Sequence, residues 1–343
     1  MNQDYRVKVF LSKETYEALI NDMNIFEFRN NTTINKSGFL NQLFANYHQI
    51  YNEKINTLLH SFDSNISNYI INSLKKFNLN KNELSELEKK INTRYKEYIK
   101  KNMSNNPDEY EELLSFKINK NNQETFEDIM YNQFLPNDTI ASYFRSLFDS
   151  YATLSQDIRE TIIFKNTFSK IEKAINKLAK IRIKNHLNQY FLISPYYIAQ
   201  TIEENHNYVI GVDDLDRIYT FKLYQIKEVI ITNDEYIYNP NIMDTIEKLI
   251  INGAQYSIDD YDKILVKLTP VGKNLFENII YNRPHLINID NDIYEFYCSK
   301  KQIIDYFIQF SNNATILTPN CLRNEFLKLY EVSYYNYKKK DEY

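Results

Sequence analysis

The stretch that decides the fold is RVKVFL, Arg6–Leu11, near the start of a chain of 343 residues. Its residues alternate between two faces, as in a half-buried strand: aliphatic side chains point one way, and Arg6, Lys8 and Phe10 point the other way. Ser12 follows as a helix N-cap, and apolar residues then recur at helical spacing up to about residue 24. The segment predicts a short strand that runs directly into a helix.

A second helix is predicted to begin at Asn35, Lys36 and Ser37, after an Asn-rich loop. A strand without a partner in its own domain leaves its backbone groups as an open edge, so we expect two copies of the chain to pair antiparallel. The product is a homodimeric ribbon backed by four helices, with Arg6, Lys8 and Phe10 facing away from the core. Such a ribbon fits the major groove of DNA, and the free N–H groups at the start of the second helix suit a phosphate.

The stretches RVKVFLSKETYEAL and INKSGFLNQLFANY together resemble the ribbon-helix-helix family. The connection between the two helices, FEFRNNTTINKS, is longer than the turn usual in that family. The resemblance implies that residues 1–52 form a dimerising, nucleic-acid-binding domain. Residues 53–165 show helical periodicity throughout and predict a linker bundle of about five helices that positions this domain.

Near residue 181 the period of the apolar residues falls from about four to two. Five short β-rich runs follow between residues 181 and 238, separated by polar turns, and they suit a small closed barrel. The runs KIEKAINKLAKIRI, ISPYYIAQTIEENHNYVIGVDD and TFKLYQIKEVIIT resemble the WYL domain. In this chain the family's Trp-Tyr-Leu appears as Asn207-Tyr208-Val209, and its basic residue in the last strand appears as Gln225.

The WYL resemblance implies that residues 166–240 form an SH3-like (Sm-like) barrel with a pocket for a nucleotide or oligonucleotide ligand. Arg217 lies on the same strand as Phe221, four residues earlier, and is a candidate to supply a guanidinium to that pocket. The full set of candidate ligand-binding residues is Tyr196, Tyr208, Arg217, Phe221, Lys222 and Gln225.

Residues 260–343 predict the order strand, helix, strand, strand, helix, strand, helix, which is ferredoxin-like. The stretch ATILTPNCLRNEFLKLY resembles the C-terminal extension that commonly follows WYL domains. That resemblance implies a ligand or partner contact for Arg323; an equally good interpretation is a surface arginine that pairs with Glu325. The chain as a whole is therefore expected to be α+β, with four domains.

Several classes of function are disfavoured by composition. With only four Gly, neither a Walker-type loop nor a dinucleotide fingerprint can be written, and two Cys with five scattered His make no zinc spacing. The cluster Asp213, Asp214 and Asp216 is better explained by turn geometry than by a metal, and no nucleophile has a plausible base. We expect no enzyme activity, no metal and no cofactor.

No apolar run reaches the length of a membrane span, and the first residues do not resemble a signal peptide, so we expect a cytoplasmic protein without a membrane partner. Because the net charge is −4, nucleic-acid binding must come from local basic patches. Residues 165–184 carry seven basic residues and one acid, and form either a solvated helix face or a phosphate track.

Module order favours a ligand-responsive transcriptional regulator whose N-terminal ribbon contacts DNA. The rival hypothesis is an accessory protein that binds single-stranded RNA and modulates an RNA-targeting CRISPR effector, as some proteins with the same module order do. Aromatic side chains near cations would suit base stacking on an unpaired strand: Tyr196, Tyr197, Tyr208, Tyr219 and Phe221 with Arg217 and Lys222.

Overall fold

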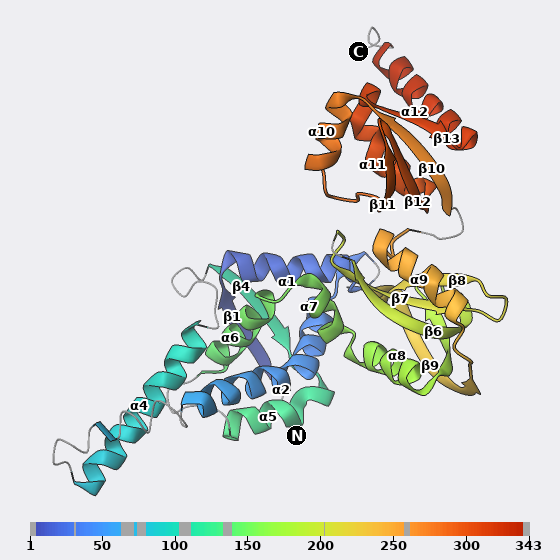
Figure 1. Ribbon diagram of the computed structural model, residues 1–343. Coiled ribbons are helices and arrows are strands. Elements are labelled where there is room, and N and C mark those ends of the chain that lie inside the picture. Colours follow the sequence, from blue (N-terminus) through green and yellow to red (C-terminus); the bar gives the residue numbers. More distant parts are fainter. Residues whose placement is uncertain are drawn as a thin grey trace. The chain divides into compact units, whose positions relative to one another are not determined.

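The computed structural model describes residues 5–30, 32–62, 72–73, 80–102, 111–132, 139–201, 203–256 and 261–338 (Figure 1). The fold is mixed α and β, and the chain divides into two compact units, residues 1–165 and 166–343. Within the described residues, no helix combines the length and the apolar character needed to cross a bilayer.

Unit 1 contains two strand-helix-helix segments. The first consists of β1 (Arg6–Leu11), α1 (Lys13–Ile25) and α2 (Lys36–Phe62), with a short hairpin of β2 (Arg29–Asn30) and β3 (Thr33–Ile34) between the helices. After α4 (Lys81–Asn102), the second consists of β4 (Glu112–Lys117), α5 (Gln123–Asn132) and α6 (Ile140–Ala152), and α7 (Gln156–Ile163) follows.

The alternation predicted for β1 is confirmed, because Val7, Val9 and Leu11 are buried while the residues between them are exposed. The prediction of a partner strand from a second copy is wrong. β1 pairs antiparallel with β4 of the same chain, from Arg6 opposite Lys117 to Leu11 opposite Glu112, and Figure 1 shows the two strands side by side. β1 therefore does not need a second copy of the chain to satisfy its backbone groups.

The prediction that residues 53–165 form only helices is wrong at β4. The run from Leu114 to Ile118 alternates buried and exposed residues, which is the period of a strand, but it is too short to stand out among the helices around it. Residues 112–163 complete the N-terminal unit and do not serve as a spacer.

The two segments of unit 1 form an internal repeat. The sequence FLNQLFANY (39–47) in α2 recurs as YFRSLFDSY (143–151) in α6. In the strands, the buried residues Val7, Val9 and Leu11 correspond to Leu114, Phe116 and Ile118. A capping residue follows each strand: Ser12 Oγ accepts from the Thr15 N–H (3.2 Å), and Asn119 Oδ1 accepts from the Asn122 N–H (3.0 Å).

Helix-to-strand hydrogen bonds repeat in the same way. Asn41 of α2 donates from Nδ2 to the carbonyl of Lys117 at the end of β4 (2.8 Å). Arg145, which occupies the equivalent position in α6, donates from Nε to the carbonyl of Phe10 near the end of β1 (2.9 Å). Unit 1 thus contains two strand-helix-helix halves, and one chain supplies both of them.

A buried ion pair ties α1 to α7. Arg159 donates from Nε and Nη2 to the two carboxylate oxygens of Asp22, at 2.7 and 2.8 Å, and the Tyr151 hydroxyl donates to the same carboxylate at 2.8 Å. Asp22 is fully buried and Arg159 is nearly so. Each charge depends on the other, because burial removes most of the water that would otherwise solvate the pair.

In unit 2, α8 (Lys165–Lys177) precedes a five-stranded antiparallel sheet of order β8-β7-β6-β5-β9. Its strands are β5 (Ala179–Asn185), β6 (Tyr190–Thr201), β7 (His206–Val212), β8 (Ile218–Lys222) and β9 (Ile226–Glu235). β6 is long enough to pair with β5 along its first half and with β7 along its second. Helix α9 (Pro240–Asn252) packs Ile246 and Leu249 into the core beside Tyr196 and Tyr208.

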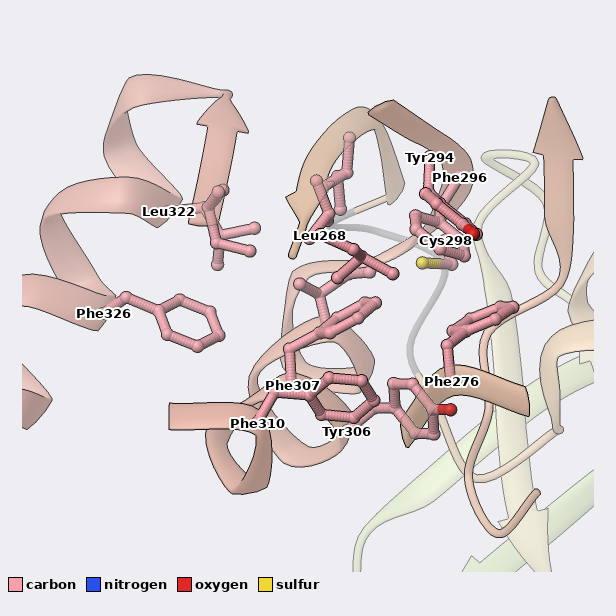
Figure 2. Close-up of a cluster of buried hydrophobic side chains, with 14 residues drawn as sticks. Leu268, Phe276, Tyr294, Phe296, Cys298, Tyr306, Phe307, Phe310, Leu322 and Phe326 are labelled. Carbon is pink, nitrogen blue, oxygen red and sulfur yellow. The ribbon is translucent and has the colours of Figure 1, made fainter. Parts of the chain in front are cut away.

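The remaining elements are β10 (Tyr261–Leu268), α10 (Pro270–Asn278), β11 (Leu286–Asp290), β12 (Ile293–Ser299), α11 (Lys300–Phe307), β13 (Ala314–Thr318) and α12 (Asn320–Lys338). They follow one another in the βαββαβ order that the sequence predicts, with a final helix, and their sheet has the order β11-β12-β10-β13. Figure 2 shows the aromatic core of this part, in which Phe296, Phe307 and Phe310 are fully buried.

The buried pair in unit 1 gives a stability prediction. Replacing Arg159 by Ala leaves the Asp22 carboxylate buried without its cation, and we expect the free energy of unfolding of unit 1 to fall by about 3–5 kcal/mol. This loss is measured by unfolding the protein in urea, with the hydrogen exchange of the α1 and α7 amides as the probe. The control is Lys13→Ala, which removes an exposed pair with Glu17 and should cost less than about 1 kcal/mol. Equal losses in the two variants would contradict the prediction.

Candidate nucleic-acid interface

The outward face of the ribbon is the surface formed by the exposed residues of β1 and β4. β1 contributes the three residues predicted from the sequence, and β4 adds three more. Across the ribbon, Arg6 lies opposite Lys117, Lys8 opposite Ser115, and Phe10 opposite Leu113. The rings and methyl groups at one end are well exposed, with Phe10 at 49% and Leu113 at 51%.

The start of α2 lies beside the end of the ribbon that carries Arg6 and Lys117. Ser37 Oγ is 3.4 Å from the Lys117 carbonyl oxygen, which Asn41 also contacts. Asn35 caps the helix, because its Oδ1 accepts from the Gly38 N–H at 2.9 Å. Lys36 donates to the Tyr16 hydroxyl (3.2 Å) and lies 5.5 Å from the centre of that ring. The predicted residues of β1 and of α2 therefore belong to one side of unit 1.

Sequence reasoning missed the three residues that β4 contributes to the outward face, namely Leu113, Ser115 and Lys117. The signal that would have found them is the internal repeat. Once FLNQLFANY is aligned with YFRSLFDSY, a second strand is expected upstream of α5 and α6, by analogy with β1 upstream of α1 and α2.

The structure does not bring the six predicted ligand-binding residues together. The β7–β8 register places Tyr208 opposite Lys222 and Val209 opposite Phe221, so neighbouring pairs face opposite sides of the sheet. Tyr208 and Lys222 both contact Glu204: the tyrosine hydroxyl donates to its carboxylate, and Lys222 Nζ lies 2.8 Å from Oε2.

Of the other four predicted residues, Arg217 and Phe221 both lie beside the ring of Tyr219, at 5.9 Å from the guanidinium carbon and 6.1 Å between ring centres. Tyr196 is buried, with its ring centre 5.4 Å from that of Tyr236, whereas Phe221 packs at 5.0 Å on Phe191. Arg217 pairs with Asp213 (Nη2 to Oδ2, 2.6 Å), and Gln225 Nε2 lies 3.4 Å from the Tyr224 hydroxyl.

A cavity of about 430 Å³ does lie in unit 2, between α8 and β6. Tyr196 is the one predicted ligand residue that lines it. Its other lining groups include the exposed ring of Tyr197 and the amides of Asn176, Gln200 and Asn207. This lining contains no cation, which differs from the anion site that the WYL resemblance implies.

The remaining sequence candidates have simple structural settings. Asp213 Oδ1 accepts from the N–H groups of Leu215 (2.9 Å) and Arg217 (3.0 Å), which is the turn geometry expected for this cluster. In the part of the chain that the structure describes, no group of three or more ligating side chains could hold a metal ion. Arg323 is exposed in the first turn of α12.

Comparison with solved structures finds a protein with a similar fold. The whole chain shares the fold of a solved CRISPR Cas-related protein. That likeness has a TM-score of 0.71 at 18% sequence identity and covers 100% of this chain and 96% of the other, so it concerns the fold alone. A second solved structure, the proteasome accessory factor PafBC of Arthrobacter aurescens, has a TM-score of only 0.27 at 12% identity over 58% of this chain and 32% of that one, too low to carry an argument.

Comparison of the sequence alone finds one partial relative and no family. No family model matches the chain. A stretch of 186 residues is 27% identical to ribonuclease Y of Mycoplasma pneumoniae; it covers 53% of this chain and only 32% of that protein. The chain thus spans about a third of the length of this curated relative.

The Glu204 contacts give a pH prediction. Burial alone would raise the pKa of Glu204, but hydrogen bonds from Lys222 and Tyr208 outweigh it and hold the pKa below its ordinary value of 4.5. A carboxylate with a lowered folded pKa stabilises the fold above its unfolded pKa, and this stabilisation is lost as the pH falls through the folded pKa.

We therefore expect Glu204→Gln to lower the thermal midpoint at pH 7, by an amount equivalent to no more than about 1 kcal/mol, and this difference from the wild type to shrink below about pH 4. Thermal unfolding of both proteins between pH 7 and pH 3 measures the effect. Glu228→Gln, at an exposed position on β9, is the control and should show no such pH-dependent difference. A difference that stayed constant down to pH 3 would contradict the prediction.

Proposed function

We propose that this protein is a nucleic-acid-binding regulator, not an enzyme, and that it binds duplex DNA through the outward face of the β1–β4 ribbon. The observation that carries the proposal is the chemistry of that face. Of its six residues three are cations, Arg6, Lys8 and Lys117, and none is acidic. The whole chain has a net charge of −4, so it does not attract phosphates as a whole. Binding to a phosphate backbone therefore requires cations that are concentrated on one face.

The shape of the surface favours duplex DNA. A two-stranded antiparallel ribbon is one of the elements that the major groove of B-form DNA admits, whereas the deep major groove of A-form RNA excludes it. Six residues span about 20 Å, which corresponds to about six base pairs. The positive end of the α2 dipole, beside Arg6 and Lys117, adds a favourable position for a phosphate.

Unit 2 is interpreted as the sensing part of the regulator. The five-stranded sheet after α8 supports the WYL-type interpretation, and the final βαββαβ part supports the C-terminal extension that accompanies it. In this interpretation a nucleotide or oligonucleotide at the barrel changes how the ribbon is presented. The ribbon itself needs no second copy of the chain.

The second candidate is an accessory role on single-stranded RNA, beside a CRISPR effector. The fold likeness to a CRISPR Cas-related protein over the whole chain favours it. Unit 2 also offers exposed aromatic rings beside cations: Lys184 Nζ lies 5.3 Å from the centre of the Tyr190 ring, which is 62% exposed. Such pairs suit stacking on unpaired bases.

Removal of the ribbon cations tests the preferred function. We expect Arg6→Ala with Lys8→Ala to weaken binding to a mixed-sequence DNA duplex by about tenfold or more, and to lower the slope of log K against log salt by about 1 per lost phosphate contact. A gel-shift series at several salt concentrations measures both quantities.

The matched control removes two cations of unit 1 that lie away from the ribbon, Lys54 in α2 and Lys89 in α4; this variant should bind the duplex like the wild type. Preference of the wild type for unstructured RNA, with no effect of the two ribbon substitutions, would favour the accessory role instead. Retention of neither nucleic acid at low salt would exclude both.

A further inference from the structure

The internal repeat of unit 1 relates the two ends of the ribbon by an approximate twofold axis. The register pairs Val7 with Phe116 and Val9 with Leu114, and in the repeat Val7 corresponds to Leu114 and Val9 to Phe116. Exchanging the two halves therefore reproduces the same pairing. The axis passes through the pair at the middle of the outward face, Lys8 and Ser115, because these two residues correspond to each other in the repeat.

The side chains of the outward face do not follow this axis. Arg6 corresponds to Leu113 in the repeat, and Lys117 corresponds to Phe10. Because Arg6 pairs with Lys117 and Phe10 pairs with Leu113, the axis exchanges a pair of cations with a pair of apolar side chains. One end of the face is cationic, and the other is apolar with both side chains about half exposed.

The surroundings of the two ends carry charges of both signs. Beside the cationic end lie Lys36 and the start of α2. At the apolar end, the last pair of the ribbon is Leu11 with Glu112, and Glu111, the residue before β4, is exposed there. Two cations also lie at the apolar end: Lys13, which is exposed just after β1, and Arg145, which donates to the Phe10 carbonyl. The difference between the two ends therefore rests on the residues of the outward face itself.

We infer that a single chain binds one asymmetric DNA site in one fixed orientation. The inference rests on the proposed function and goes beyond it. The cationic end lies on phosphates or on the acceptor edge of a guanine, and the apolar end lies against thymine methyl groups, the apolar feature of the major groove. A ribbon built from two identical chains would bring the same residues to both ends and would favour a palindrome.

The test is directed cleavage of DNA from one end of the ribbon. The exposed Cys321 is first replaced by Ser, while the buried Cys298 is kept. Lys120→Cys, three residues after the cationic end of β4, then carries a tethered iron chelate that cleaves the backbone nearby. The probe is a duplex of about 12 base pairs, long enough for one ribbon of about six, recovered with the full chain from a randomised pool.

We expect one chain per duplex by native mass spectrometry, and cleavage on one flank of the recovered site in excess over the other by about tenfold or more. The matched variant, Phe10→Lys with Leu113→Arg, gives both ends the same side chains at two exposed positions. It should still bind, and should cleave both flanks about equally.

Three results separate the inference from the function beneath it. Recovery of no duplex by the wild type overturns the proposed function itself. Equal cleavage of both flanks by the wild type, or a requirement for two chains on one short duplex, overturns the inference while DNA binding stands. One-sided cleavage by the Phe10→Lys, Leu113→Arg variant shows that these end residues do not set the orientation, and this too overturns the inference.

Discussion

Unit 1 depends on the six-residue pairing of β1 with β4. The pairing satisfies the backbone groups of two short strands that would otherwise be open edges, and it buries Val7, Val9, Leu114 and Phe116 together. Register is strict here: a shift of one residue would bring the cations of the outward face into the core. The same pairing that builds the hydrophobic layer therefore also defines the candidate interface.

That β4 lies in the same chain changes the thermodynamics of the ribbon. A homodimeric ribbon forms only when the protein concentration exceeds its dissociation constant, whereas this ribbon forms with the fold of each chain. The segment between the strands is about a hundred residues long, but the entropy of closing a loop grows only with the logarithm of its length. Helices α1, α2 and α4 lie within that segment and contribute their own packing to the unit.

The sequence predicted the parts of the fold that local periodicity determines. The faces of β1, the cap at Ser12, the start of α2 and the βαββαβ order of the C-terminal part all follow from patterns of a few residues. Contacts between distant segments were not predictable in this way. β4 was hidden because its alternation is brief and lies between predicted helices. The β7–β8 register, which places Tyr208 and Phe221 on opposite faces of the sheet, is set by strand pairing and not by spacing.

The repeat also explains why the outward face could become asymmetric while the core did not. Leu43, Phe44 and Tyr47 recur as Leu147, Phe148 and Tyr151 because all six side chains are buried in close packing, where a change of shape is costly. The outward residues are exposed and lie outside this close packing, so the fold limits them less. In a homodimer, symmetry would still force both ends to carry the same residues. Joining the two halves in one chain removes that constraint, so that a cation at one end can correspond to an apolar side chain at the other without disturbing the ribbon between them.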